Sequence, residues 1–291
     1  MQPGTFRAPW TGLALALVGG ALAIALAAPV NADAAKCFGK KATIVGSDRS
    51  DRLVGTRKAD VIFARRGNDR IVGKGAPDRI CGGPGNDKVK GSIGIDSLGG
   101  GLGNDELSGG SEEDYLEGEE GNDDLDGGDG DDFDLYGGDG KDRVDGGEGD
   151  DTVYLETRGG DPDVYAGGAG IDTLNLSYAQ SSALIVSLDG VANDGVNCPQ
   201  QCEGDNVESS VENVSGPEAA ASLTLIGSDA NNVLTGGYLK DAIDGGAGDD
   251  ILRGGWDDDS LDGGLGTDQC DGEGESAADT AVNCESIVGI P

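Results

Sequence analysis

An aspartate recurs at every ninth position of this chain, ten times without interruption: Asp51, Asp60, Asp69, Asp78, Asp87, Asp96, Asp105, Asp114, Asp123 and Asp132. Two positions after most of these aspartates stands an aliphatic residue: Leu53, Ile62, Ile71, Ile80, Val89, Leu98, Leu107, Leu116 and Leu125. A period of nine fits neither a heptad nor one face of a helix. It predicts a tight turn followed by a very short strand whose middle side chain points inward, repeated along the chain.

Glycines precede most of these aspartates, most clearly in GGPGNDKVK (82–90) and GGLGNDELS (100–108). After a one-residue insertion near Tyr136 the pattern continues, and a second array follows; their anchor residues are Asp142, Asp151, Asp163, Asp172, Asn232, Asp241, Asp250, Asp259 and Asp268. Glycine supplies the positive φ of a tight turn, and aspartate supplies a hard anionic oxygen that suits calcium. The alternative is a glycine-rich solenoid in which the aspartates only form Asx turns.

These segments resemble the RTX (hemolysin-type) nonapeptide repeat G-G-x-G-x-D-x-U-x, in which U is a large aliphatic residue. The resemblance implies an all-β fold, a right-handed parallel β-roll with two nonapeptides in each full turn. It also implies that several Ca²⁺ ions bind between stacked turns. The composition and the N-terminal segment are similar to those of small secreted RTX-type proteins of high-GC Gram-positive (actinobacterial) organisms.

The doubled period of 18 residues divides the turns into two columns. In one, Gly-Asn-Asp recurs at 67–69, 85–87, 103–105 and 121–123; the other, which contains Asp78, Asp96 and Asp114, is irregular. We therefore expect the best calcium sites along the regular column. The predicted metal-binding residues are Gly67, Asp69, Gly85, Asp87, Gly103, Asp105, Gly121, Asp123, Asp132, Asp142, Asp151, Asp172, Asp250, Asp259 and Asp268.

The charge of the chain predicts that folding depends on a cation. The 291 residues include 55 Asp or Glu, 20 Lys or Arg and no histidine, a formal net charge of −35. Aromatic residues make up only 4%, so little apolar surface is available to offset self-repulsion. We expect a chain that is largely disordered without calcium and folds as calcium binds.

The N-terminus predicts export. Arg7, an apolar run at 13–28 and Ala32-Asp33-Ala34 have the order of a secretory signal peptide; a retained membrane anchor is the alternative. The expected organisation is a signal peptide at 1–34, an N-terminal cap at 35–50, a first array at 51–175, a β-rich insert at 176–226, a second array at 227–271 and a C-terminal cap at 272–291. The insert is expected to pack on the roll.

Six cysteines in a secreted chain favour disulfide bonds. Among the 15 possible connectivities, their spacing favours Cys37–Cys81, Cys198–Cys202 and Cys270–Cys284. A metal–thiolate site is the weaker interpretation, and free buried thiols are the third.

Positive charge is concentrated near the N-terminus. Residues 36–90 hold 14 Lys or Arg against 6 Asp or Glu, whereas residues 91–291 hold 5 against 48. Arg52, Arg70 and Lys88 recur 18 residues apart and should form an outward-facing ladder. It is either a site for an anionic cell-wall or extracellular polysaccharide, or a protection against edge-to-edge stacking, which we favour. Nucleic acid is a poor partner for so acidic a chain with so few aromatics.

Catalysis has little support in the sequence. The lack of histidine excludes His-based triads and the H-E-x-x-H zinc site, and no G-x-S-x-G or P-loop motif occurs. We therefore expect a secreted, monomeric, non-enzymatic calcium-binding protein without a membrane span after signal cleavage. The alternatives are an extracellular adhesin or matrix protein that binds an anionic polymer, and a calcium-dependent, polysaccharide-active solenoid enzyme that uses Arg65, Arg66 and Lys90.

Overall fold

The computed structural model of the chain describes residues 36–156, 161–177, 183–196, 204–216, 221–273 and 279–290. These residues form short strands and turns, with no helix, and so include no helix long and apolar enough to span a membrane. The predicted signal peptide lies outside the described residues.

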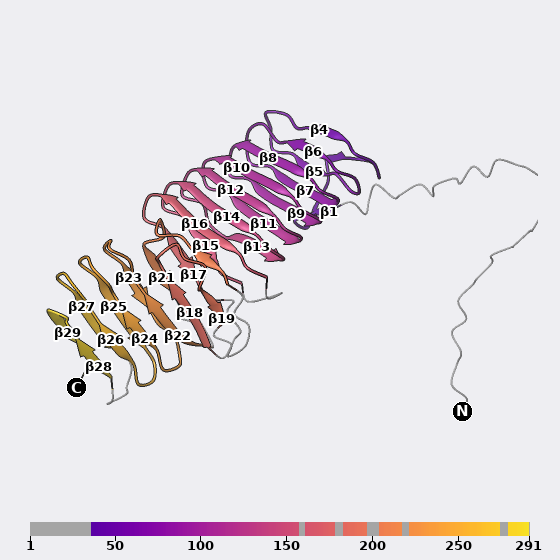
Figure 1. The fold of residues 1–291 in the computed structure, drawn as a ribbon. Coiled ribbons are helices and arrows are strands. Elements are labelled where there is room, and N and C mark those ends of the chain that lie inside the picture. The colour runs from indigo at the N-terminus through magenta and orange to yellow at the C-terminus, as the bar shows by residue number, and fades with distance from the viewer. Residues whose placement is uncertain are drawn as a thin grey trace, which may run out of the picture. The chain divides into compact units, whose positions relative to one another are not determined.

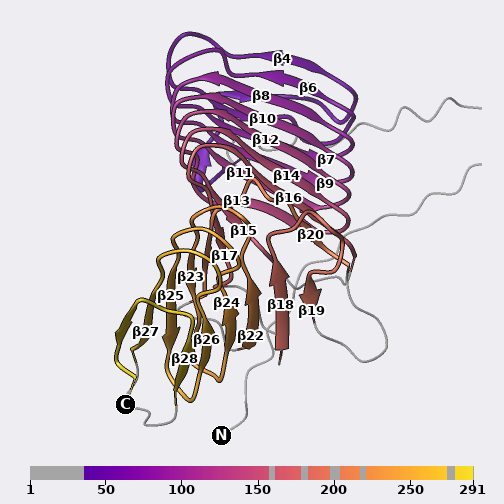
Figure 2. The same ribbon diagram turned by 60° about the vertical axis from the view of Figure 1, so that its left-hand side comes forward.

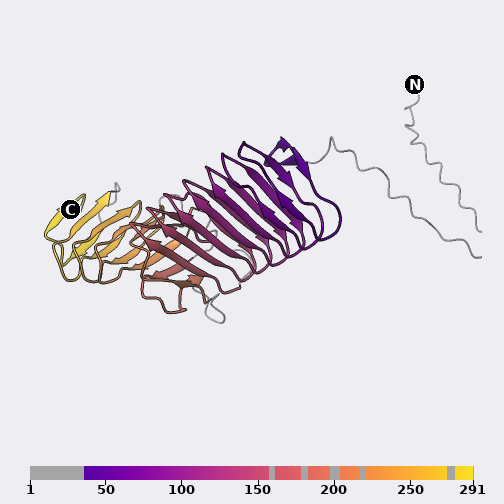
Figure 3. The ribbon, with the colours of Figure 1, turned by 90° about the horizontal axis from the view of Figure 1, so that it is seen from above.

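The strands stack as rungs in three sheets (Figures 1 and 3). The 8-stranded sheet contains, in spatial order, β4 (Arg52–Val54), β6 (Arg70–Val72), β8 (Lys88–Ile93), β10 (Glu106–Ser111), β12 (Asp124–Asp129), β14 (Arg143–Glu148), β16 (Val164–Ala169) and β20 (Asn206–Val207). The 13-stranded sheet contains β3 (Ile44–Val45), β5 (Val61–Phe63), β7 (Arg79–Pro84), β9 (Ser97–Leu102), β11 (Tyr115–Glu120), β13 (Leu135–Asp139), β15 (Thr152–Tyr154), β17 (Thr173–Asn175), β21 (Asn213–Ser215), β23 (Val233–Thr235), β25 (Ile251–Gly255), β27 (Gln269–Glu273) and β29 (Ser286–Val288).

The 6-stranded sheet contains β19 (Gly195–Val196), β18 (Ala183–Ser187), β22 (Ser222–Ile226), β24 (Ala242–Asp244), β26 (Ser260–Asp262) and β28 (Thr280–Val282). All strand pairs in the three sheets are parallel except β18–β19, which is antiparallel. A separate antiparallel hairpin of β1 (Lys36–Cys37) and β2 (Lys40–Lys41) precedes the first rung.

The predicted parallel β-roll with an 18-residue turn is confirmed. Leu107 pairs with Val89 on one side and with Leu125 on the other, and successive strands alternate between the 8-stranded and 13-stranded sheets. The aliphatic residue two positions after each aspartate points into the narrow space between the sheets. This core includes Ile62, Ile71, Ile80, Val89, Leu98, Leu107, Leu116, Leu125, Leu135, Val144, Val153, Leu174, Leu234, Leu252 and Leu261, all almost fully buried.

The extra residue of the first array is two to three positions earlier than predicted. Leu116 pairs with Leu135, a separation of 19, and the preceding Asp134 has a positive φ of 59°. The chain therefore takes up the insertion at Phe133–Asp134, where Phe133 is exposed, and restores the inward position at Leu135.

The predicted insert continues the solenoid with a change of sheet. The 13-stranded sheet runs through it without interruption, since β21 pairs with both β17 and β23. The 8-stranded sheet ends at β20, and the 6-stranded sheet takes over the other side beginning with β18 and β22 (Figure 2). Within residues 176–226, the longest strands are β18 and β22.

Two of the predicted disulfides are present at the two ends of the roll. Cys37 is bonded to Cys81 with a Cα–Cα distance of 5.7 Å, which ties the β1–β2 hairpin to β7. Cys270 is bonded to Cys284 at 6.0 Å, which ties β27 to the segment between β28 and β29. Cys198 and Cys202 lie outside the described residues.

Core packing predicts that substitution of two leucines of β9 changes stability by very different amounts. Leu98 is fully buried and Leu102 is 46% exposed. Leu98→Ala should lower the free energy of unfolding of the calcium-loaded protein by about 2–5 kcal/mol, because it leaves a cavity between the sheets. The matched control Leu102→Ala should change it by less than about 0.5 kcal/mol. Urea denaturation measures both, and equal effects would contradict the inward assignment.

Candidate metal site

The repeat aspartates are linked to one another along each column. One carboxylate oxygen, Oδ1, accepts a hydrogen bond from the backbone N–H of the aspartate one turn earlier. Asp105 Oδ1 accepts from Asp87 N at 2.7 Å, and Asp114 Oδ1 accepts from Asp96 N at the same distance. The side chains therefore lie inside the turns with their carboxylates fixed in orientation, almost fully buried.

The other carboxylate oxygen, Oδ2, is buried and has no hydrogen-bond donor at most turns. We call these open turns; their aspartates are Asp69, Asp78, Asp87, Asp96, Asp105, Asp114, Asp123, Asp132, Asp142, Asp151, Asp172, Asp250, Asp259 and Asp268. A buried anionic oxygen without a donor is unfavourable unless a proton or a cation neutralises it.

The φ angle of the residue four positions before the aspartate distinguishes open turns from a second kind of turn. In every open turn that residue has a positive φ: Arg65, Lys74, Gly83, Ser92, Gly101, Gly110, Glu119, Gly128, Gly138, Gly147, Gly168, Gly246, Gly255 and Gly264. Positive φ is unfavourable for a side chain, so the non-glycine residues mark local strain.

In the second kind, which we call closed turns, the same residue is not in the positive-φ region and its N–H donates to the anchor side chain. Ser47 N donates to Asp51 Oδ2 at 2.6 Å, and Thr56 N donates to Asp60 Oδ2 at 2.7 Å. Likewise, Gly237 N donates to Asp241 Oδ2 at 2.7 Å, and Ser228 N donates to Asn232 Oδ1 at 2.8 Å. Closed turns thus satisfy their anchors with protein groups alone.

Glycine allows neighbouring turns to bring oxygens together. A Cβ on Gly82 would collide with Asp87 Oδ2 and lie 2.7 Å from the carbonyl oxygen of Gly100, one turn further on. A Cβ on Gly85, whose φ is +150°, would collide with the carbonyl oxygen of Gly67. The carboxylate oxygen of Asp87 and the carbonyl oxygen of Gly100 therefore face the same small region beside Gly82.

This donor set fits a calcium ion. Calcium takes six to eight hard oxygen ligands from carboxylates and backbone carbonyls, and each open turn offers both kinds. In the described part of the chain, no three His, Cys, Asp or Glu side chains converge as a metal cluster. A site would thus draw its remaining ligands from backbone carbonyls.

Burial raises the pKa of most open-turn carboxyl groups. Desolvation raises the pKa of Asp105 to about 8; the hydrogen bond from Asp87 N opposes the rise, and the smaller repulsion from Asp123 and Asp87 adds to it. Desolvation likewise raises the pKa of Asp114 to about 8, against the hydrogen bond from Asp96 N and together with the smaller repulsion from Asp132 and Asp96. Without a cation, the protonated form of these carboxyl groups is therefore favoured in the roll.

All the aspartates predicted to bind metal anchor open turns, and the predicted glycines Gly67, Gly85, Gly103 and Gly121 have positive φ. The irregular column has the same carboxylate geometry: Asp78, Asp96 and Asp114 are open too. The unbroken nine-residue spacing of these three aspartates could have placed them among the predicted metal-binding residues. Stronger binding along the regular column stays a prediction.

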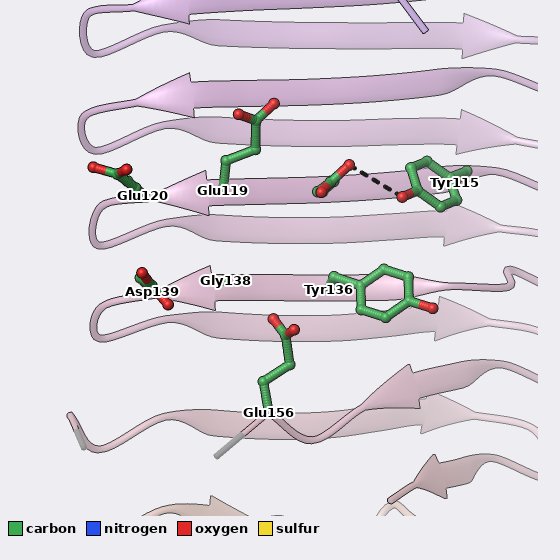
Figure 4. Close-up of a pocket in the computed structure, with 8 residues that line it drawn as sticks. Tyr115, Glu119, Glu120, Tyr136, Gly138, Asp139 and Glu156 are labelled. Carbon is green, nitrogen blue, oxygen red and sulfur yellow. Dashed lines mark hydrogen bonds between the residues drawn. The ribbon is translucent and has the colours of Figure 1, made fainter. Parts of the chain in front are cut away.

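A hollow of about 430 Å³ on the outer face of the 13-stranded sheet adds negative charge beside several open turns (Figure 4). It is lined by Tyr115, Glu117, Glu119, Glu120, Tyr136, Gly138, Asp139 and Glu156. Glu119 contributes to the raised pKa values of Asp105 and Asp123, and Glu156 and Asp139 contribute to that of Asp142. Their negative potential favours a cation at these turns.

Comparison with known proteins agrees with this geometry. The family model of the RTX calcium-binding nonapeptide repeat matches residues 45–80, 65–98, 82–115, 99–134, 134–153 and 235–270, together about half of the chain. A search of curated proteins found no match. The chain belongs to the RTX nonapeptide-repeat family, whose repeats bind calcium.

The raised pKa values predict how the calcium-free protein responds to pH. Unfolded aspartates lose their protons near pH 4, whereas Asp105 and Asp114 in the roll keep theirs to about pH 8. Between these limits the folded state binds more protons, so stability must fall as pH rises. Thermal melting in calcium-free buffer should show a midpoint that falls as pH rises from 5, until no folded state is left to melt near pH 7.5. With saturating calcium the fall should be much smaller; a calcium-free midpoint that rises with pH would contradict the shifts.

Open and closed turns predict different effects of the same substitution. Asp105→Asn keeps an acceptor for Asp87 N but removes the charge, so calorimetry should find about one calcium ion fewer. Asp241→Asn is the matched control, since both its oxygens accept N–H donors, from Leu223 and Gly237. The control should lower stability and leave the number of ions unchanged. Equal ion counts for the two variants would contradict the distinction.

Proposed function

We propose that this protein binds a row of calcium ions at its open turns and folds as they bind. The observation that carries the proposal is the repeated buried Oδ2 with no donor, opposite carbonyl oxygens of the adjacent turn. Calcium would supply positive charge that the turns lack. Asp87, Asp105 and their equivalents would hold it, and the glycine backbone would bring the carbonyls close enough.

Coupling between binding and folding is supported by the small core and the large charge. Each nonapeptide contributes essentially one inward aliphatic side chain, while the chain as a whole carries a net charge of −35. The buried carboxylates repel their neighbours one turn away, as the pKa values of Asp105 and Asp114 indicate. We infer that the open-turn rungs are unstable at neutral pH without a cation.

We propose that the protein acts outside the cell. The bonds Cys37–Cys81 and Cys270–Cys284 are compatible with an oxidising compartment, and millimolar calcium outside cells suits modules with dissociation constants on the order of 10⁻⁴–10⁻³ M. Secretion through the signal peptide at 1–34, a monomeric state and the lack of enzymatic activity stay predictions.

Binding of an anionic polymer, as an extracellular adhesin or matrix protein, is a second proposed function. The observation that favours it is a row of exposed cations on β4, β6 and β8, in a part of the chain with more cations than anions. It is compatible with the first function, because a calcium-loaded roll would present this row on a rigid sheet.

Far-UV circular dichroism of the mature chain, with disulfides intact, tests the first function. Addition of calcium to calcium-free protein at pH 7.5 should produce a cooperative change from coil to β-structure near millimolar concentration. Magnesium at the same concentration is the matched control and should be much less effective, because it demands smaller, octahedral sites. A full β spectrum without calcium would contradict coupled folding, and no calcium binding by calorimetry would contradict the function itself.

A further inference from the structure

The cations Arg52, Arg70 and Lys88 form a straight row on the 8-stranded sheet. Arg52 pairs with Arg70 across β4 and β6, and Arg70 pairs with Lys88 across β6 and β8, so the three lie on successive rungs. Figure 2 shows these strands at the N-terminal end of the roll. All three side chains are exposed, and neighbouring strands are about 4.8 Å apart. Positive charge therefore repeats at this short interval.

Most of this row has no counter-charge in the described structure. Lys88 forms an ion pair with Glu106 on the next rung. No carboxylate of the described residues forms an ion pair with Arg52 or Arg70. Like charges directly opposite one another on neighbouring strands are destabilising, so the row does not contribute to the stability of the sheet.

Protection of a sheet edge explains only one member of the row. β4 is the edge strand, so Arg52 can discourage another sheet from adding there. Arg70 and Lys88 lie on the second and third rungs, already paired on both sides, and point outward from the face of the sheet. Edge protection therefore leaves Arg70 and Lys88 unexplained, and their arrangement favours a ligand on the face.

The row borders a hollow of about 450 Å³ on this face. Lys90 and the half-buried Val72 also line it, and Glu106 and Asp126 add acidic side chains beside Ser108. No aromatic side chain lines the hollow, which disfavours stacking of nucleic-acid bases. The surface thus combines closely spaced cations with one apolar side chain, because Ile71 and Val89 point into the core.

We propose that this face binds a linear polysaccharide with a carboxylate on each sugar, laid across β4, β6 and β8. The inference rests on the second proposed function and names its ligand class and residues. A single anion would engage one cation, whereas a polymer with closely repeated carboxylates matches Arg52, Arg70 and Lys88 together. Arginine holds carboxylates through paired hydrogen bonds, and the half-buried Val72 offers an apolar contact to a sugar ring.

The test is binding of a short, fluorescently labelled oligogalacturonate to the calcium-loaded full chain at low salt, measured by anisotropy. Arg52→Gln/Arg70→Gln should weaken binding by at least about tenfold, because two arginine–carboxylate contacts are lost. Arg79→Gln/Lys141→Gln removes the same charge elsewhere and should change affinity less than about threefold. Circular dichroism and calcium calorimetry confirm that both variants are folded and loaded.

Several outcomes separate the explanations. Undiminished binding by Arg52→Gln/Arg70→Gln would overturn the inference while leaving polymer binding intact, and would indicate bridging through calcium. An equal loss in both variants would also overturn it, because net charge alone would then account for binding. Equal affinity for an uncharged oligosaccharide would exclude the carboxylate as the recognised group. No binding of oligogalacturonate by the wild-type chain would overturn the inference, and binding of polyphosphate alone would replace its ligand class.

Discussion

The buried carboxylate oxygen that lacks a donor is the constraint on which this roll depends. At each open turn one oxygen of the aspartate joins adjacent turns through a backbone N–H, and the other faces the backbone without a partner. The first interaction fixes the spacing of the rungs, and the second leaves a negative charge that must be neutralised. The same residue thus builds the solenoid and, in the function that we propose, makes it depend on a cation or on protons.

Closed turns show how the chain avoids this dependence at particular places. They occur at Asp51 and Asp60 in the first rungs and at Asn232 and Asp241 where the second array begins. Where the period breaks, other side chains complete the column: Glu212 accepts from Asp172 N. Tyr165 hydroxyl donates to Asp163 Oδ2 in the same region. If calcium binds at the open turns as proposed, the N-terminal and central rungs should depend on it less than the arrays on either side of the centre.

The sequence was sufficient to predict the roll because its turn is local and repeated. The nine-residue spacing of Asp and Gly fixes the turn, and the aliphatic residue at Leu98 or Leu107 fixes the inward face. The disulfide pairs Cys37–Cys81 and Cys270–Cys284 followed from the spacing of the cysteines.

Other features depend on contacts that a local pattern does not contain. The role of Asp205, whose Oδ1 accepts from Asp163 N 42 residues earlier, requires the path of the insert. The difference between open and closed turns depends on one φ angle, and residues as unlike as Arg65, Lys74 and Glu119 adopt the open form. The irregular sequence around Asp78 and Asp114 concealed a carboxylate geometry equal to that of the regular column.

A crystal structure of the calcium-loaded chain, with the ions located by anomalous scattering, would show whether calcium binds at the open turns. We expect ions beside Oδ2 of the open-turn aspartates in both columns and none beside Asp51, Asp60, Asn232 or Asp241. Ions distributed without regard to open and closed turns, or no ions at Asp105 and Asp114, would contradict this expectation.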